Sequence, residues 1–128
     1  MGHVHGAECE ECGCEFEVSQ GGGFKFHLLR CDACGKSKCM SFDEIGEPHL
    51  QYIKGLNTPY CLATAESDRK IQENYPGEPL SREDYHRAVQ NLAGKCSCGG
   101  LFKFDAEARC PKCRSTKIIK REIKMFYD

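Results

Sequence analysis

The sequence predicts a small α+β protein in which two cysteine-rich β modules flank a mainly helical middle segment. Eleven of the 128 residues are cysteines, and most of them stand in close pairs near the two ends. Tryptophan is absent and aromatic residues make up only 9% of the chain, so its apolar cores must be small. Small domains with thin cores usually depend on metal ions or disulfides for stability, and the cysteines suit that role.

We divide the chain into four parts: a flexible leader over 1–7, an N-terminal cysteine module over 8–40, a helical middle segment over 41–94 and a C-terminal cysteine module over 95–128. Residues 15–18 alternate as a strand does, and the glycines at 21–23 predict a turn. A longer strand is predicted within 116–127, with one apolar face made by Ile119, Ile123, Met125 and Tyr127.

The middle segment contains one clear helix signal, over residues 82–93. Ser81 offers a hydroxyl N-cap, acidic residues follow in the first turn, and Gly94 suits the C-terminal cap. An apolar stripe at helical spacing is formed by Tyr85, Ala88, Val89 and Leu92. A shorter helix is predicted over 48–54, where proline stands at the first position, and the pattern over 62–74 is weakly helical.

The cysteine spacing favours metal ligands over disulfides. The total is odd, so full pairing would leave one thiol over, and residues 1–6 have no apolar core of the kind a signal peptide needs. We therefore expect a reduced, cytoplasmic protein with two metal sites, because tetrahedral zinc takes four thiolates. The expected ligands are Cys9, Cys12, Cys31 and Cys34 for the first site, and Cys96, Cys98, Cys110 and Cys113 for the second.

The alternative to metal is a group of reduced core thiols, but packing gives no reason for paired spacing to recur. Two Zn²⁺ ions per chain are favoured over iron, because the second set contains a Cys-x-Cys pair and because Arg114 follows Cys113 where the other pairs have glycine. Gly13, Gly35 and Gly99 stand at that place, where a positive φ lets an amide turn back toward a sulfur.

These pairs, with a hairpin-length interval between the two pairs of each set, resemble the zinc-ribbon superfamily over residues 9–35 and 96–113 and the strand after Cys113. The resemblance implies rubredoxin-like knuckles and three-stranded sheets, here as two ribbons, and it indicates an architecture rather than one function. The first module, with Cys14 directly after Gly13, is also similar to the short regulatory-type zinc ribbons of bacteria.

The remaining cysteines and histidines carry no catalytic pattern. Cys14 is interpreted as a strand residue beside the first pair, although it could exchange with a ligand, and Cys39 and Cys61 as small core residues. The histidines are interpreted as tail residues (His3 and His5), a solvent-facing strand residue (His27) and surface or half-buried helix residues (His49 and His86). No Ser-His-Asp order or phosphate-binding loop is present, so an enzyme is not indicated, and no apolar run is long enough to span a membrane.

Four thiolates leave no open position on a metal ion, so both sites are expected to be structural. The net charge is −6 over residues 1–94 and +5 over 95–128, which suggests that the C-terminal module contacts nucleic acid or an acidic protein. The candidate nucleic-acid contacts are Lys103, Arg109, Lys112, Arg114, Lys117, Lys120 and Arg121. The predicted function is an interaction module; the alternative is a redox protein, either a rubredoxin-like iron electron carrier or a zinc-thiol switch using Cys96, Cys98, Cys110 and Cys113.

Overall fold

The computed structural model describes residues 2–23 and 25–127, which form a small α+β protein with two antiparallel sheets and four α-helices. The N-terminal elements are β1 (Gly2–Cys9), β2 (Glu15–Gln20), β3 (Phe26–Cys31) and β4 (Ser37–Ser41). The helical part contains α1 (Phe42–Ile45), α2 (Glu47–Lys54), the 3₁₀ turn η1 (Leu62–Thr64), α3 (Ala65–Asn74) and α4 (Arg82–Ala93). The chain then returns through β5 (Phe102–Lys103) and β6 (Ile118–Tyr127).

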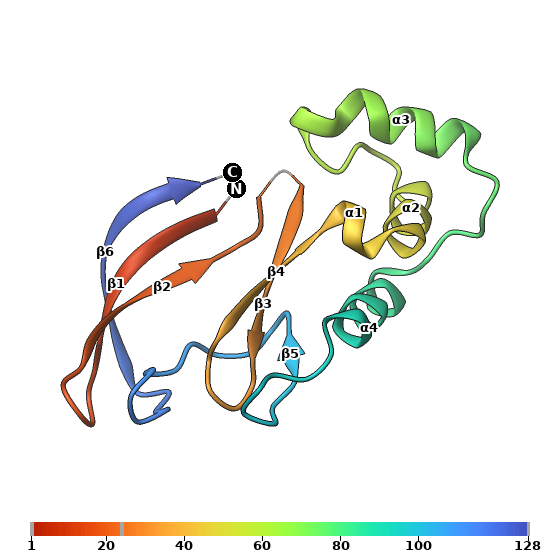
Figure 1. Ribbon diagram of the computed structural model, residues 1–128. Helices are drawn as coiled ribbons and strands as arrows, with labels where there is room; N and C mark the ends of the chain where they lie inside the picture. The colour runs from red at the N-terminus through yellow and green to blue at the C-terminus, as the bar shows by residue number, and fades with distance from the viewer. Residues whose placement is uncertain (1, 24, 128) are drawn as a thin grey trace.

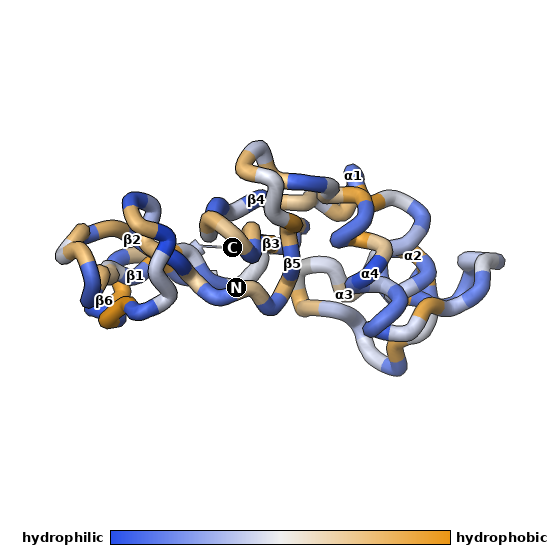
Figure 2. The backbone as a smooth tube through the Cα atoms, turned by 90° about the horizontal axis from the view of Figure 1, so that it is seen from below, coloured by the Kyte–Doolittle hydropathy of each residue, from blue (hydrophilic) through white to orange (hydrophobic). Residues whose placement is uncertain are grey.

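The two sheets are nested within the sequence. The outer sheet has the order β2-β1-β6, and the inner sheet has the order β4-β3-β5. Each therefore combines a hairpin from the first third of the chain with a strand from the last third, and the helices are inserted between β4 and β5. Figure 1 shows the outer sheet at one end of the molecule, the inner sheet in the middle and the helices at the other end, and the view from below shows the same succession (Figure 2).

The segment that the sequence predicts as a flexible leader is instead the central strand of the outer sheet. Strand β1 pairs with β2 on one side and with β6 on the other, from Gly2 opposite Tyr127 to Cys9 opposite Ile118. Ala7 is buried, and so is His5, which the sequence places in a loose tail. The prediction is wrong because the second partner of this strand lies more than a hundred residues away, where no local pattern reports it.

The helix predicted over residues 82–93 is confirmed as α4. The Ser81 hydroxyl accepts a hydrogen bond from the Asp84 amide at 3.2 Å, and Gly94 ends the helix with a φ of 74°. The predicted stripe is only partly buried: Leu92 is exposed, Ala88 is half-buried, and the buried residues are Tyr85, Val89 and Ala93. The face that meets the inner sheet therefore repeats every four residues.

The main hydrophobic core lies between the inner sheet and helices α1 and α4. It contains Leu29 and Met40 from the sheet, Ile45 from α1 and Val89 from α4, together with Phe102 of β5. Cys31 and Cys96, two of the predicted metal ligands, belong to the same core, so these thiols and the apolar residues form one packed unit.

A buried tyrosine connects the inner sheet to two helices through histidines. The Tyr85 hydroxyl lies 2.8 Å from Nε2 of His27 on β3 and 2.9 Å from Nδ1 of His49 on α2. Both histidines are buried, whereas the sequence suggests surface positions. Burial, together with the neighbouring His49 and His86, lowers the pKa of His27 to about 4, so at neutral pH the ring is uncharged and only one of its nitrogens carries a proton.

We expect stability to fall with acidification between about pH 6.5 and pH 4, because His27 binds a proton more readily in the unfolded chain. A group with a depressed folded-state pKa contributes stability above its unfolded value and loses it as the pH falls toward the folded value. The shift corresponds to about 3 kcal/mol at most. Urea unfolding at pH 7.5 and pH 5 measures it.

His27→Gln supplies the control for this pH dependence. Acid also releases metal from thiolates, but it does so in both proteins, so the difference between them isolates the histidine. The variant should lose less stability than the wild type between the two pH values. Equal losses would show that His27 does not carry the effect.

Ion pairs between the acidic N-terminal part and the basic C-terminal part hold β6 against the β1–β2 hairpin. They join Arg121 to Glu8, Lys124 to Glu17 and Lys117 to Glu11. Several apolar side chains of β6 nevertheless remain exposed, including Ile123 and Phe126.

In the described part of the chain, no helix is both long and apolar enough to cross a bilayer.

Candidate metal centres

The eight predicted ligands gather into two clusters of four, but the pairs are exchanged relative to the prediction. The outer cluster, formed by the β1–β2 turn and the turn that precedes β6, contains Cys9, Cys12, Cys110 and Cys113. The inner cluster, beside the inner sheet, contains Cys31, Cys34, Cys96 and Cys98. The grouping by sequence order, with Cys9 to Cys34 in one site and Cys96 to Cys113 in the other, is therefore corrected. Each cluster combines one pair from each end of the chain because each sheet does.

The sulfur positions fit a tetrahedral metal site. In each cluster all four Sγ atoms lie within 4.8 Å of one another. The outer cluster has Sγ–Sγ distances of 3.5 Å for Cys9–Cys113 and for Cys12–Cys110. Four sulfurs bound to zinc at about 2.3 Å lie about 3.8 Å from one another, whereas a disulfide joins its sulfurs at about 2 Å. The inner cluster has the same spacing, at 3.5 and 3.6 Å.

Tight turns of one kind bring together the cysteines of the Cys-x-x-Cys pairs. The residue after the second cysteine has a positive φ in each: 74° at Gly13, 80° at Gly35 and 64° at Arg114. Its amide donates to the carbonyl of the first cysteine, as from Gly13 to Cys9 at 3.0 Å, rather than to a sulfur as expected. Arg114 shows that this turn forms without glycine, and it is the one non-glycine residue at positive φ in the described chain.

Other backbone amides donate to the sulfurs and favour their ionised form. The Cys12 amide lies 3.5 Å from Sγ of Cys9, and the Lys112 amide lies 3.4 Å from Sγ of Cys110. Although burial raises the pKa of Cys110, the amides of Cys113 and Lys112 lower it to about 6. The amide of Cys98 similarly lowers the pKa of Cys96 to about 6, against the effect of burial. Each cluster thus contains a thiol disposed to bind a cation as thiolate.

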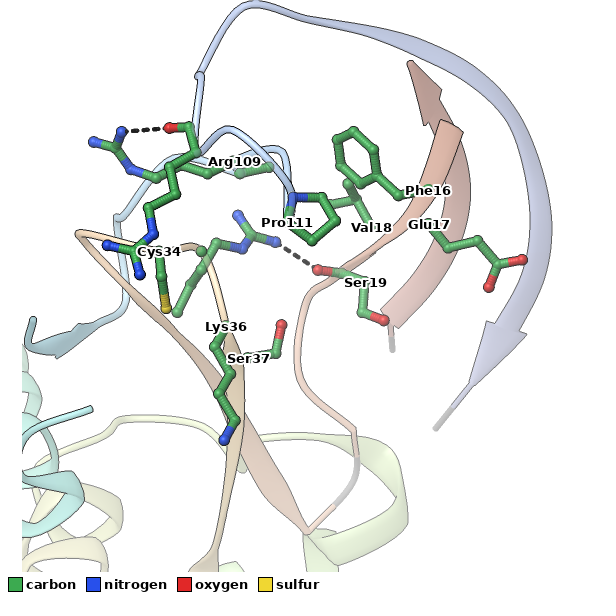
Figure 3. A pocket seen from close by; sticks show the side chains of 13 residues that line it. Phe16, Glu17, Val18, Ser19, Cys34, Lys36, Ser37, Arg109 and Pro111 are labelled. Atoms are coloured by element: carbon green, nitrogen blue, oxygen red, sulfur yellow. Dashed lines mark hydrogen bonds between the residues drawn. The ribbon is translucent and has the colours of Figure 1, made fainter. Parts of the chain in front are cut away.

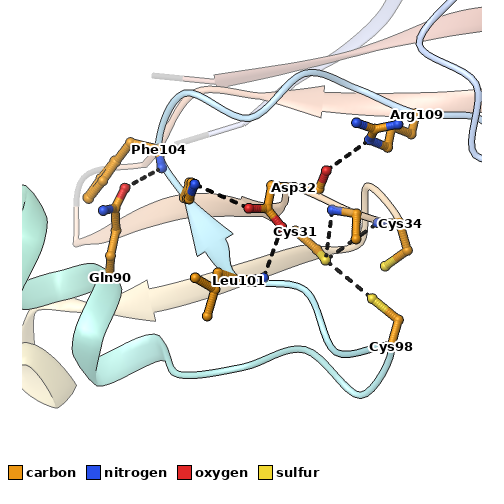
Figure 4. A network of polar contacts seen from close by, with 10 residues as sticks. Cys31, Asp32, Cys34, Gln90, Cys98, Leu101, Phe104 and Arg109 are labelled. Atoms are coloured by element: carbon orange, nitrogen blue, oxygen red, sulfur yellow. Dashed lines mark hydrogen bonds and ion pairs between the residues drawn. The ribbon is translucent and has the colours of Figure 1, made fainter.

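Asp32 and Arg109 connect the two clusters. One Asp32 carboxylate oxygen accepts a hydrogen bond from the Leu101 amide at 3.0 Å, and the other forms an ion pair with Lys103 at 3.2 Å. These two contacts hold the Cys31–Cys34 turn against the segment that follows Cys98. Arg109 donates from Nε to the Asp32 carbonyl and from a terminal nitrogen to the Arg114 carbonyl, at 3.1 and 2.9 Å. Figure 4 shows the hydrogen bonds of Asp32 with Leu101 and Arg109 beside the facing sulfurs of Cys31 and Cys98. The sequence gives no signal for either linking role.

The clusters differ in their exposure. Cys12 and Cys113 of the outer cluster are exposed, whereas no ligand of the inner cluster is: Cys31 and Cys96 are buried, and Cys34 and Cys98 are half-buried. Cys14 is half-buried beside the outer cluster, and burial together with the neighbouring Cys110 and Cys12 raises its pKa. Cys39 is exposed on β4 and Cys61 is half-buried before η1, so neither is the fully buried core residue that the sequence suggests.

Gly100 is a further residue that the inner cluster requires. A Cβ at this position would lie 2.5 Å from Sγ of Cys31 and 2.8 Å from Cβ of Ala33. We predict that Gly100→Ala displaces the Cys31 sulfur, lowers the metal content toward one ion per chain and costs about 1–3 kcal/mol of unfolding free energy. Native mass spectrometry and urea unfolding measure the two effects.

The adjacent Gly99→Ala is the matched control. Its φ of 95° strains any residue other than glycine, but an added Cβ meets no atom within 4 Å. The Gly99→Ala variant should therefore lose about 1 kcal/mol of unfolding free energy and keep both metal ions. If the two variants lose metal equally, backbone strain rather than contact with the sulfur explains the effect.

The predicted basic contacts fall into three groups. Lys103, Lys117 and Arg121 form ion pairs with acidic side chains of the same molecule. Arg109 and Arg114 form no ion pair in the described chain and line one cavity between the two sheets. Lys112 and Lys120 are exposed. About half of the predicted basic surface is thus used to hold the fold together.

The nested sheets and their four-cysteine clusters define a small α+β protein with two candidate metal sites. The chain belongs to the family described as "Domain of unknown function (DUF8255)", whose model matches residues 5–119 and so covers both clusters. No curated protein and no solved structure matches the chain.

Proposed function

We propose that the protein is a zinc-stabilised interaction module built from two nested zinc ribbons. The observation that supports it best is the assembly of two four-sulfur clusters of tetrahedral dimensions from eight cysteines spread over more than a hundred residues. Each cluster lies beside the strands that a ribbon requires, with a hairpin pair and a returning strand. Since four thiolates fill the coordination of zinc, the ions serve as scaffold and the function is binding.

In this proposal zinc replaces the apolar core that the outer sheet lacks. The main core lies at the inner sheet, whereas most side chains of β6 are exposed. The outer cluster joins the β1–β2 turn to the segment that leads into β6. Metal binding energy is then part of the folding energy, and a reducing compartment such as the cytoplasm suits the thiolates.

Metal analysis and visible absorbance of protein purified without added metal test the proposal. Two zinc ions per chain, no visible colour and loss of the outer sheet on chelation are the expected results. A red protein containing iron would instead indicate a rubredoxin-like electron carrier. Native folding without any metal would contradict the proposal as a whole.

A second candidate function is a thiol switch at the outer cluster, favoured by its exposed ligands and by the fifth thiol of Cys14. The four cysteines predicted for such a switch, Cys96, Cys98, Cys110 and Cys113, are divided between the two clusters and do not form one site. In the switch proposed here, hydrogen peroxide accepts two electrons from two outer thiolates. A sulfur–sulfur bond forms, the peroxide oxygens take up protons and leave as water, and Zn²⁺ is released.

Zinc release at low peroxide concentration distinguishes a switch from an inert scaffold. A switch predicts that one ion per chain is released first and that Cys14→Ser slows the release. Cys39→Ser removes an exposed thiol away from either cluster and should leave the rate unchanged. Equal loss of both ions, or no loss, would exclude this second function.

A further inference from the structure

A cavity of about 410 Å³ lies between the two sheets, beside the turn that contains Cys34 and the turn that contains Pro111. Its lining includes Phe16 and Val18 of β2, Pro111 of the outer cluster's second turn, and the inner ligand Cys34. Figure 3 shows these apolar groups and Arg109 arranged around it. Its volume is in the range of small-ligand sites.

Cations without carboxylate partners concentrate in this cavity. Arg30, Arg109 and Arg114 line it, together with Lys36. Within residues 2–23 and 25–127, none of these four forms an ion pair, although cations elsewhere do. Glu17 is the acidic residue in the lining; it pairs with Lys124, and Figure 3 shows its carboxylate directed away from Arg109.

Two of the guanidinium groups are held in place by backbone carbonyls. Arg30 donates to the carbonyls of Ser19 and Ala106 at 2.6 and 3.2 Å. Arg109 is fixed by the carbonyls of Asp32 and Arg114. These hydrogen bonds leave further N–H groups free on both guanidinium groups. A partly buried cation without a counter-charge costs free energy, which an anion in the cavity would offset.

We propose that this cavity, which we call the arginine cleft, binds a phosphate group of a nucleotide or nucleic-acid strand. A phosphate offers several oxygens and up to two negative charges to the three guanidinium groups, whereas a carboxylate offers two oxygens and one charge. Phe16 and Pro111 provide an apolar surface beside the charged groups for a base or sugar. This inference rests on the proposed function as an interaction module, and it assigns the contact with the partner to this cleft.

The charge of the clusters supplies the competing explanation for the same residues. A zinc ion with four thiolates carries a net charge of about −2, so the arginines could serve only to balance the two sites. In that case their removal weakens metal binding and the cleft has no ligand. Measuring metal content and phosphate binding on the same samples separates the two roles.

The test uses the zinc-loaded protein with two probes, a labelled single-stranded thymidine dodecamer and inorganic pyrophosphate. The variant Lys36→Gln/Arg114→Gln removes two exposed cations of the cleft. Lys70→Gln/Arg87→Gln is the matched control, because it removes one lysine and one arginine from exposed positions on α3 and α4.

We expect the cleft variant to bind the dodecamer on the order of tenfold more weakly than the wild type, and the control to change less than about twofold. The dependence of log affinity on log salt should become shallower by about 1.4 if two phosphate contacts are lost. Pyrophosphate should compete with the dodecamer. Binding of pyrophosphate alone, again weakened in the cleft variant, would identify a small phosphorylated ligand as the source of the phosphate.

Three results would overturn the proposal. They are no binding of either probe, equal weakening in both double variants, and tighter binding of poly-glutamate than of the dodecamer. Loss of zinc from the cleft variant with no binding by the wild type would assign the arginines to charge balance. If the purified protein contains no zinc, the proposed function is contradicted rather than the arginine cleft. Metal analysis of the same samples therefore distinguishes the failure of one proposal from the failure of the other.

Discussion

Replacing Cys9 and Cys113 together with serine should remove one metal ion per chain, whereas replacing Cys9 and Cys31 should remove both. The first two cysteines belong to the outer cluster, and the second two belong to different clusters. We expect a four-thiolate site to release its ion when even one ligand is removed, and structural zinc contributes about 10–16 kcal/mol in small domains. Native mass spectrometry counts the ions directly.

The two double variants form a matched set because each removes two thiols and shares Cys9. A grouping by sequence order predicts the opposite pattern, in which the Cys9/Cys31 variant keeps one ion and the Cys9/Cys113 variant keeps none. Since domains are stable by only about 5–15 kcal/mol, loss of both ions should also unfold the protein. The Cys9/Cys113 variant should keep the inner sheet and helix α4, which far-ultraviolet circular dichroism reports.

Tyr85→Ala should destabilise the protein by about 3–5 kcal/mol, the cost of removing a large buried aromatic side chain. The ring is fully buried, stacks on Tyr52 at a centroid distance of 4.2 Å and bonds through its hydroxyl to His27 and His49. Its removal therefore loosens α4 from both β3 and α2. Urea unfolding of zinc-loaded protein gives the free energy.

Tyr85→Phe separates the hydroxyl from the ring. It keeps the packing but leaves two buried histidine nitrogens without their partner, at a cost of about 1–3 kcal/mol. His86→Ala is a useful comparison, because that ring stacks on Phe104 at 4.1 Å but is only partly buried. A Phe variant as stable as the wild type would show that the hydrogen bonds to Tyr85 contribute little.

The sequence identifies what is local in this protein. The spacing of the cysteines identifies all eight residues of the two clusters, and the caps at Ser81 and Gly94 define α4 at both ends. The positive φ predicted after the second cysteine is also present at Gly13 and Gly35. In each case the required interactions join residues close in sequence, so the pattern itself carries the information.

What the sequence does not reveal depends on pairing between distant segments. The ligands are exchanged between sites because β6 joins β1, and that strand pairing has no signature in either segment alone. Similarly, the charge difference between the two parts suggests an external partner, whereas Lys117 and Arg121 find theirs in Glu11 and Glu8. A lone histidine such as His27 has no periodicity that would report its burial.

The nesting of the two clusters has a consequence for the order in which the protein is made. Cys34 and Cys96 are 62 positions apart, and Cys12 and Cys110 are 98 apart, so a ribosome releases all inner ligands before the outer set is complete. Once the inner cluster closes, the outer cysteines are separated only by the short connections 13–30 and 99–109, which lowers the entropy lost in joining them. We therefore expect the inner site to bind its metal ion first during synthesis. Until β6 is made, the two cysteines of the β1–β2 turn have no partners to complete the outer site.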